Sequence, residues 1–255
     1  RHQILKFDVS RYYAIFFNQS IHPALKEKEV RAALSDAVNR GMLVGQLFRP
    51  DNAYGAPGPI PVNMPEFDAE IYEVAAEDPL IEIANRLEQA GWKLNEEGVR
   101  AKTMQKTKVN LDFEIVVPAA KFLVDAASLI KEEWQKIGVR LTPAILKPSE
   151  VINQAIKTRN YQMILFGHIL NNNPDVFSFW HSSQRFYPGL NLALFNDKTV
   201  DNLLESIRQN FDEATRQKDL SKLQKIIHEQ QPALFLFSPR LRWARRTFLW
   251  VGAGD

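Results

Sequence analysis

The chain has 255 residues, 45% of them apolar and 24% charged, a composition typical of a folded domain with a sizeable core. Its 32 basic and 30 acidic residues leave a net charge of +2, which argues against nucleic acid as a partner because nucleic-acid modules carry a basic excess. The lack of cysteine excludes disulfides, thiolate nucleophiles and zinc-thiolate sites, and no apolar run is long enough to span a membrane. The sequence starts at Arg1, without a methionine, in a pattern typical of a strand. We therefore expect a fragment whose targeting signal lies upstream.

The first part of the chain combines one clear strand with short helices. The segment RYYAIFFN is rich in aromatic and branched residues, which is typical of a strand. Apolar residues then recur at helical spacing, and Gly41 and Gly91 are placed to end two of the helices. In chain order we expect a strand at 11–18, helices at 26–39 and 42–48, a proline-rich loop at 50–65, a helix at 78–90 and a hairpin or surface loop at 95–107.

The middle of the chain alternates strands and helices. The segment VNLDFEIVV alternates apolar and polar residues, which predicts a strand, and an amphipathic helix follows it. Strands joined by helices in this way imply an α/β fold with parallel strands and right-handed crossovers. The predicted elements are strands at 109–117, 139–145 and 161–166, helices at 119–136 and 148–158 between them, then helices at 199–210 and 213–230 and a last strand at 233–238.

A polar loop follows the predicted strand at 161–166. In α/β sheets, ligands bind beyond the carboxyl ends of the strands, which is where this loop would lie. The amide side chains of Asn171, Asn172 and Asn173 both donate and accept hydrogen bonds, so they could hold a neutral polar group such as a peptide backbone. His168 and Asp175 lie in the same region. Ordinary turn chemistry explains an asparagine triplet equally well, and is the commoner case.

A second candidate site lies at the start of the predicted helix at 119–136. Free backbone N–H groups and the helix dipole favour an anion such as a carboxylate there, and Lys121 would lie in the first turn. The alternative is that this helix end meets only water, as most do.

No constellation typical of an enzyme or a metal site stands out. The motifs HExxH, GxSxG, GxGxxG and the Walker loop are all missing. His168, Asp175 and His181 could converge on a metal ion, but histidines in loops are more often plain surface residues. The tail at 240–251 mixes arginine with tryptophan, and a solvated strand pair explains it better than nucleic-acid binding because the whole chain is nearly neutral.

Several blocks in order resemble the C-terminal lobe of family 5 extracellular solute-binding proteins, which serve ABC importers for oligopeptides, dipeptides and nickel. The matching blocks cover nearly the whole chain from Tyr12 to about Ser238, which makes them more specific together than singly. They are Val30–Arg31–Ala32–Ala33–Leu34 with Ala37–Val38–Asn39–Arg40, then Ala90–Gly91–Trp92, Trp134 to Val139, His181–Ser182–Ser183, Gly189–Leu190–Asn191, Val200 to Leu204 and Ile226 to Pro232.

This resemblance implies a periplasmic-binding-protein type II lobe, in which helices flank a mixed, mostly parallel sheet. Residues 1–18 would be strands near the hinge, 19–238 the solute-binding lobe, and 239–255 a return segment toward a first lobe absent from this chain. The implied location is extracytoplasmic, either periplasmic or anchored on the outer face of the membrane. The implied partners are a peptide or other small solute and a membrane permease, with no cofactor and no enzymatic activity.

The resemblance also implies a specific departure in the loop. In peptide binders of the family, an aspartate of this loop pairs with the α-amino group of the ligand, and its place falls on Asn171. The neighbouring aromatic place falls on His168. Because an amide lacks the charge of a carboxylate, a blocked peptide or an uncharged solute fits better than a free amino terminus. A second hypothesis is a scaffold or chaperone-like module that keeps the fold without importing anything.

Overall fold

The computed structural model describes residues 2–72, 80–170 and 173–246. Its centre is a six-stranded sheet with the order β3-β10-β2-β9-β7-β8. Strands β9, β7 and β8 pair in parallel, while β2 is antiparallel to both β9 and β10, so β10 runs in the same direction as the parallel strands. The strand bounds are β2 Arg11–Phe17, β3 Ala53–Gly55, β7 Asp112–Pro118, β8 Arg140–Leu146, β9 Met163–Ile169 and β10 Ala233–Pro239.

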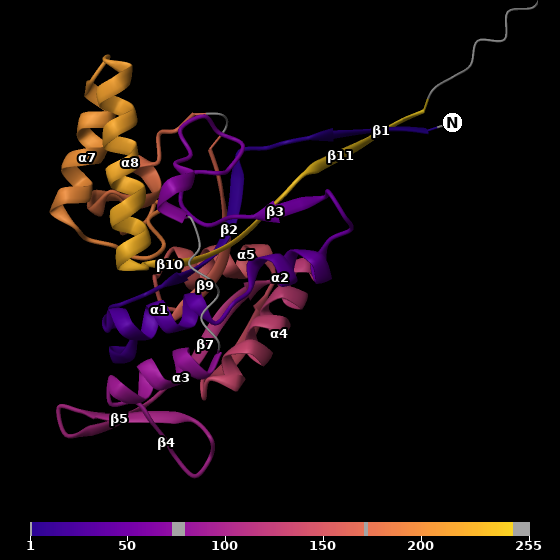
Figure 1. The fold of residues 1–255 in the computed structure, drawn as a ribbon. Coiled ribbons are helices and arrows are strands. Elements are labelled where there is room, and N and C mark those ends of the chain that lie inside the picture. The colour runs from indigo at the N-terminus through magenta and orange to yellow at the C-terminus, as the bar shows by residue number, and fades with distance from the viewer. Residues whose placement is uncertain (1, 73–79, 171–172, 247–255) are drawn as a thin grey trace, which may run out of the picture.

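Helices cover both faces of this sheet (Figure 1). Alternation along the strands separates the two cores, since Ile15 and Phe17 of β2 face one side and Tyr12, Ala14 and Phe16 face the other. The first face carries α1 Lys28–Asp36, α2 Arg40–Leu47, α3 Leu80–Gln89 and α4 Lys121–Lys136. The second carries a π-helix at Val151–Ile156, α6 Phe177–Trp180, α7 Lys198–Gln209 and α8 Glu213–Gln230. The predicted α/β fold with helices flanking a mixed sheet is therefore confirmed.

Two further sheets extend from this body. Strands β1 His2–Phe7 and β11 Leu241–Arg246 pair antiparallel and form a ribbon that projects away from the helices (Figure 1). Strands β4 Lys93–Leu94, β5 Arg100–Met104 and β6 Thr107–Asn110 form a small antiparallel sheet next to α3. Short helical turns complete the chain: η1 Pro23–Lys26, η2 Ala69–Tyr72, α5 Pro148–Glu150 and η4 Ser182–Gln184.

Two predicted boundaries are wrong. The single strand expected at 109–117 is split at Leu111, which leaves β6 in the small sheet and starts β7 in the large one. Leu111 donates its N–H to the Arg100 carbonyl and accepts from the Arg140 N–H, so it bridges the two sheets. The loop expected at 50–65 contains the short strand β3, which pairs with β10. The expected start of the helix at 78–79 lies outside the described residues.

Candidate functional site

The carboxyl ends of β7, β8, β9 and β10 meet at one edge of the large sheet. The strand register places Pro118 beside Leu146 there, and it places Ile169 beside Arg11, the first residue of β2. The ribbon leaves the sheet at this same edge, because β1 leads into β2 and β10 leads into β11 (Figure 1). We call it the ribbon edge. It is the position at which α/β sheets place their ligands.

Apolar side chains are exposed along the ribbon edge. Ile169 at the end of β9 is 53% exposed, and Ile145 near the end of β8 is 51% exposed. Phe7 and Leu241, which face each other at the base of the ribbon, are also exposed. Because so many branched and aromatic side chains at one edge would normally be covered, this edge has the character of a binding surface.

The described residues of the loop after β9 bond to one another and to the residue before β2. Leu170 donates its backbone N–H to the Ser10 carbonyl at 2.7 Å, which ties the loop to the residue just before β2. Asn173 donates its N–H to the Leu170 carbonyl, and its side-chain oxygen accepts the N–H of Asp175 at 3.0 Å. Asn173 is exposed, and its side chain makes the local backbone contact that is typical of asparagine in turns. The predicted ligand residues Asn171 and Asn172 lie outside the described residues.

Asp175 is occupied by contacts within the protein. Its carboxylate accepts the backbone N–H of Phe177 at 3.1 Å, at the start of α6. It also accepts hydrogen bonds from Nε and Nη2 of Arg208 of α7, the shortest being 2.7 Å from Nη2 to Oδ2. The Arg208 guanidinium in turn lies 3.8 Å from the centre of the Phe177 ring. Asp175 therefore joins the loop to α7, and a solute would have to share a carboxylate that is already paired.

His168 lies in the interior, which corrects the prediction that it lines a ligand site. Its side chain points into the second core and is 3% exposed. The ring stacks on Phe179 with centroids 3.9 Å apart, and the Tyr12 hydroxyl lies 2.9 Å from Nδ1. Burial lowers the pKa of His168 to about 3, so the ring is neutral near pH 7 and acts as a packing residue under the loop.

Lys121 is the first residue of α4 and lies at the ribbon edge, three residues beyond the end of β7. Its side chain is 87% exposed and its Nζ lies 2.7 Å from the Asp125 carboxylate one turn later. The N-cap residue Ala120 has no side chain that could bond to the free N–H groups of the first turn. An exposed ion pair of this kind is weak, so the ammonium group can turn toward an incoming anion.

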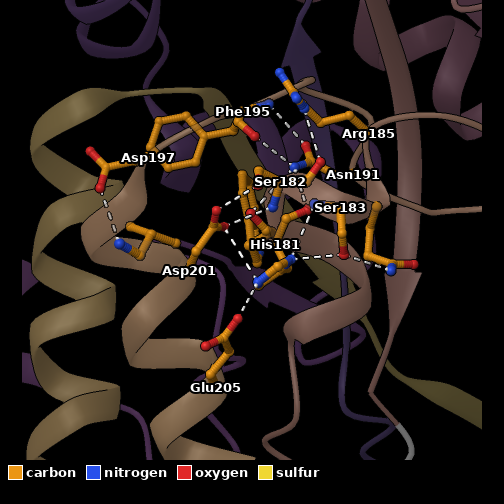
Figure 2. A network of polar contacts seen from close by, with 12 residues as sticks. His181, Ser182, Ser183, Arg185, Asn191, Phe195, Asp197, Asp201 and Glu205 are labelled. Carbon is orange, nitrogen blue, oxygen red and sulfur yellow. Dashed lines mark hydrogen bonds and ion pairs between the residues drawn. The ribbon is translucent and has the colours of Figure 1, made fainter.

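The motif residues His181, Ser182 and Asp201 form a polar network (Figure 2). The sequence motifs contain these residues but do not predict that they contact one another. Asp201 of α7 accepts the backbone N–H of Ser182 at 2.8 Å and also its hydroxyl. The His181 ring lies between Ser183, with Nδ1 2.8 Å from the hydroxyl, and Glu205, with Nε2 3.3 Å from the carboxylate. The motif therefore fastens α6 and the turn η4 onto α7.

A serine, a histidine and a carboxylate in a row also resemble a nucleophile with its base and acid. Here, however, Nδ1 of His181 also accepts the backbone N–H of Ser183 at 3.1 Å, which is the geometry of a helix cap. The metal alternative is not supported among the described residues, where no group of three His, Cys, Asp or Glu side chains could hold an ion. His168, Asp175 and His181 each bond to other partners instead.

A profile described as "Bacterial extracellular solute-binding proteins, family 5 Middle" matches residues 3–187. The chain belongs to this family. Among curated protein sequences, none matches the chain. The helices of the described part include none that is long and apolar enough to cross a bilayer.

Several solved structures share the fold of this chain. The oligopeptide-binding protein AppA from Bacillus subtilis, solved with a nonapeptide, superposes with a TM-score of 0.84 at 25% identity, over 95% of this chain and 47% of that one. NikZ from Campylobacter jejuni, solved with Ni(L-His), gives 0.81 at 24% identity, over 94% and 47%. An oligopeptide-binding protein from Thermus thermophilus with a pentapeptide gives 0.82 at 21% identity, over 96% and 44%. The chain thus spans less than half the length of each.

Proposed function

We propose that this chain is a non-enzymatic solute-binding lobe of an ABC importer. The observation that carries the proposal is the family 5 match together with the arrangement of the ribbon edge, where loops, an unshielded helix N-terminus and exposed apolar residues meet. The ribbon would connect this chain to a second lobe. That lobe would close over the ribbon edge, and the solute would lie between the two lobes. Delivery would then be to a permease in the membrane, from an extracytoplasmic location.

The proposed solute is peptide-like or another small molecule with few positive charges. A nonapeptide and Ni(L-His) occupy two of the similar structures, which supports both kinds of molecule as candidate solutes. On this lobe, Asp175 is paired with Arg208, while Lys121 at the ribbon edge offers a positive charge. With an amide at Asn171, we infer that this lobe recognises carbonyl and carboxylate groups in preference to a free amino terminus. Asn172 and Asn173 would add neutral hydrogen bonds from the same loop.

The first prediction tests the loop in the full-length protein. Asn171→Ala should weaken solute binding by about ten- to a hundredfold, because a buried polar group of the solute loses its partner. The melting temperature should stay nearly unchanged, since a loop amide contributes little to the core. Calorimetry against free and N-acetylated peptides and Ni(L-His), with a thermal melt of each variant, makes the measurement.

Two further variants sharpen this test. Asn202→Ala on the exposed face of α7 is the matched control and should change neither affinity nor stability. Asn171→Asp should favour peptides with a free amino terminus over acetylated ones. Unchanged affinity in both Asn171 variants would remove the loop from the site. A full-length protein that binds no member of the panel would instead favour the scaffold or chaperone-like alternative.

A further inference from the structure

A short loop on the second face of the sheet exposes apolar side chains that have no role in the proposed solute site. We call residues 185–190 the aromatic loop. Within it, Phe186 is 65% exposed, Tyr187 54% and Leu190 42%. Three large apolar side chains on six consecutive residues form a concentrated exposed patch, unlike the scattered single residues that need no explanation.

Hydrogen bonds from a buried arginine fix the backbone of the aromatic loop. Arg159, which is 5% exposed, donates from Nε to the Arg185 carbonyl at 2.7 Å and from Nη2 to the Gly189 carbonyl at 2.5 Å. The Gly189 N–H closes the turn on the Phe186 carbonyl at 2.8 Å, and a side chain at Gly189 would overlap with the backbone of Gln184. Buried polar contacts thus fix the loop, and its apolar side chains are left to face solvent.

Two cations lie against the exposed rings. The Lys157 ammonium is 5.7 Å from the centre of the Tyr187 ring, and the Arg185 guanidinium is 5.8 Å from that of Phe186. Within the described residues, neither cation forms an ion pair. The carboxylates that contact the neighbouring turn, Asp201 and Glu205, bond to Ser182 and His181 instead. The patch is therefore apolar and locally positive.

We propose that the aromatic loop binds the surface of an anionic membrane. Aromatic rings enter the boundary between headgroups and acyl chains, while lysine and arginine pair with lipid phosphates. A stable protein interface needs about 800 Å² and some twenty residues on each partner, far more than one six-residue loop supplies. A second copy of the chain fits poorly as well, because two-fold pairing would bring Lys157 and Arg185 of one copy close to the same two cations of the other.

The position of the loop separates this contact from the solute site. The Arg159 carbonyl accepts a hydrogen bond from Asn18, just past the carboxyl end of β2, whereas the ribbon joins β2 at its start. The seven residues of β2 span roughly 20 Å, so the loop is anchored near the end of the sheet opposite the ribbon edge. A protein resting on a membrane through this loop would hold its solute edge toward the solution. Binding must then be weak enough to release the protein for delivery.

Vesicle co-sedimentation of the purified protein tests the proposal. Vesicles of phosphatidylglycerol mixed with phosphatidylcholine should bind the protein more tightly than pure phosphatidylcholine vesicles, and the difference should shrink in high salt. The double variant Phe186→Ala with Tyr187→Ala should weaken binding by about tenfold or more, because both inserting rings are lost. Lys157→Glu should weaken binding to the anionic vesicles alone, by about fivefold or more.

Phe211→Ala is the matched control, because Phe211 is 99% exposed in the α7–α8 turn, outside the aromatic loop. It should bind as tightly as the unchanged protein. Failure to bind anionic vesicles, or equal binding by the double variant and the control, would overturn the proposal and leave the loop as a candidate protein contact. Lys157→Glu keeps the test valid if the double variant misfolds, since its side chain is exposed and its removal opens no cavity.

Discussion

At the scale of single residues, Asn191 shows how one buried amide can define a turn. It is fully buried, and its Nδ2 lies within hydrogen-bonding distance of the carbonyls of Trp180, His181 and Phe195. Its Oδ1 accepts the Phe195 N–H at 3.0 Å. The segment between α6 and α7 folds around this side chain, which explains the asparagine in the family-like motif without any ligand.

We predict that Asn191→Ala lowers the free energy of unfolding by about 3 kcal/mol or more, because several buried backbone groups lose their partner together. Denaturant unfolding of the purified chain provides the value. Asn202→Ala, an asparagine on the exposed face of α7, should stay within about 0.5 kcal/mol of the unchanged protein. Similar losses in the two variants would mean that water replaces the Asn191 amide.

The buried ring of His168 should make the free energy of unfolding depend on pH. Its pKa is about 3 in the folded protein against an ordinary value of 6.5, so protons bind the unfolded chain first. Stability from this group is complete above pH 6.5 and falls as the pH drops toward 3, by about 1.4 kcal/mol per pH unit. Between about pH 7 and about pH 5 the protein should therefore lose roughly 2 kcal/mol on this account.

The matched variant for this prediction is His168→Phe, which keeps the stack on Phe179 and removes the titrating group. The variant should lose less stability over the same pH range, even if it is less stable at neutral pH because Tyr12 loses its partner. His22 and His228, whose pKa values burial also lowers, remain in both proteins and cancel in the comparison. Identical pH profiles would contradict the prediction.

At the scale of elements, periodicity predicted most helices and strands because each buries one face. The unit β7, α4, β8 and β9 forms as expected, and Trp134 in the stripe of α4 is fully buried, with its indole N–H bonded to the Leu34 carbonyl. What failed depended on distant partners. The break at Leu111 follows from backbone bonds to Arg100 and Arg140, and β3 exists only because β10 lies beside it.

The candidate site was predictable only in outline, for the same reason. The order of strands and helices predicts which edge collects the loops. It does not predict which face of β9 a given side chain takes, and a shift of one residue exchanges the faces. Gly167 therefore packs against Tyr13, while His168 next to it enters the opposite core. Asp175 had no sequence signal for its pairing with Arg208, which lies far along the chain on α7.

At the scale of the whole molecule, the two cores on either side of the sheet predict that the chain folds on its own. Thermal unfolding should be cooperative, with far- and near-ultraviolet circular dichroism changing together. A molten state, with far-ultraviolet signal alone, would contradict this.

The isolated chain should bind peptides weakly or not at all, because half a cleft leaves one side of the ligand in water. Micromolar affinity by calorimetry for this chain alone would refute that part.

The ribbon has a topological consequence. Its register pairs His2 with Arg246 and Phe7 with Leu241, so positions at opposite ends of the described chain lie side by side. A hairpin turn joining β11 to β1 would close the backbone into a ring without moving any strand of the large sheet. That ring could be reopened at Gln105–Lys106, the turn between β5 and β6, where both residues already have positive φ. A circularly permuted chain that starts at this turn should therefore reach the same fold.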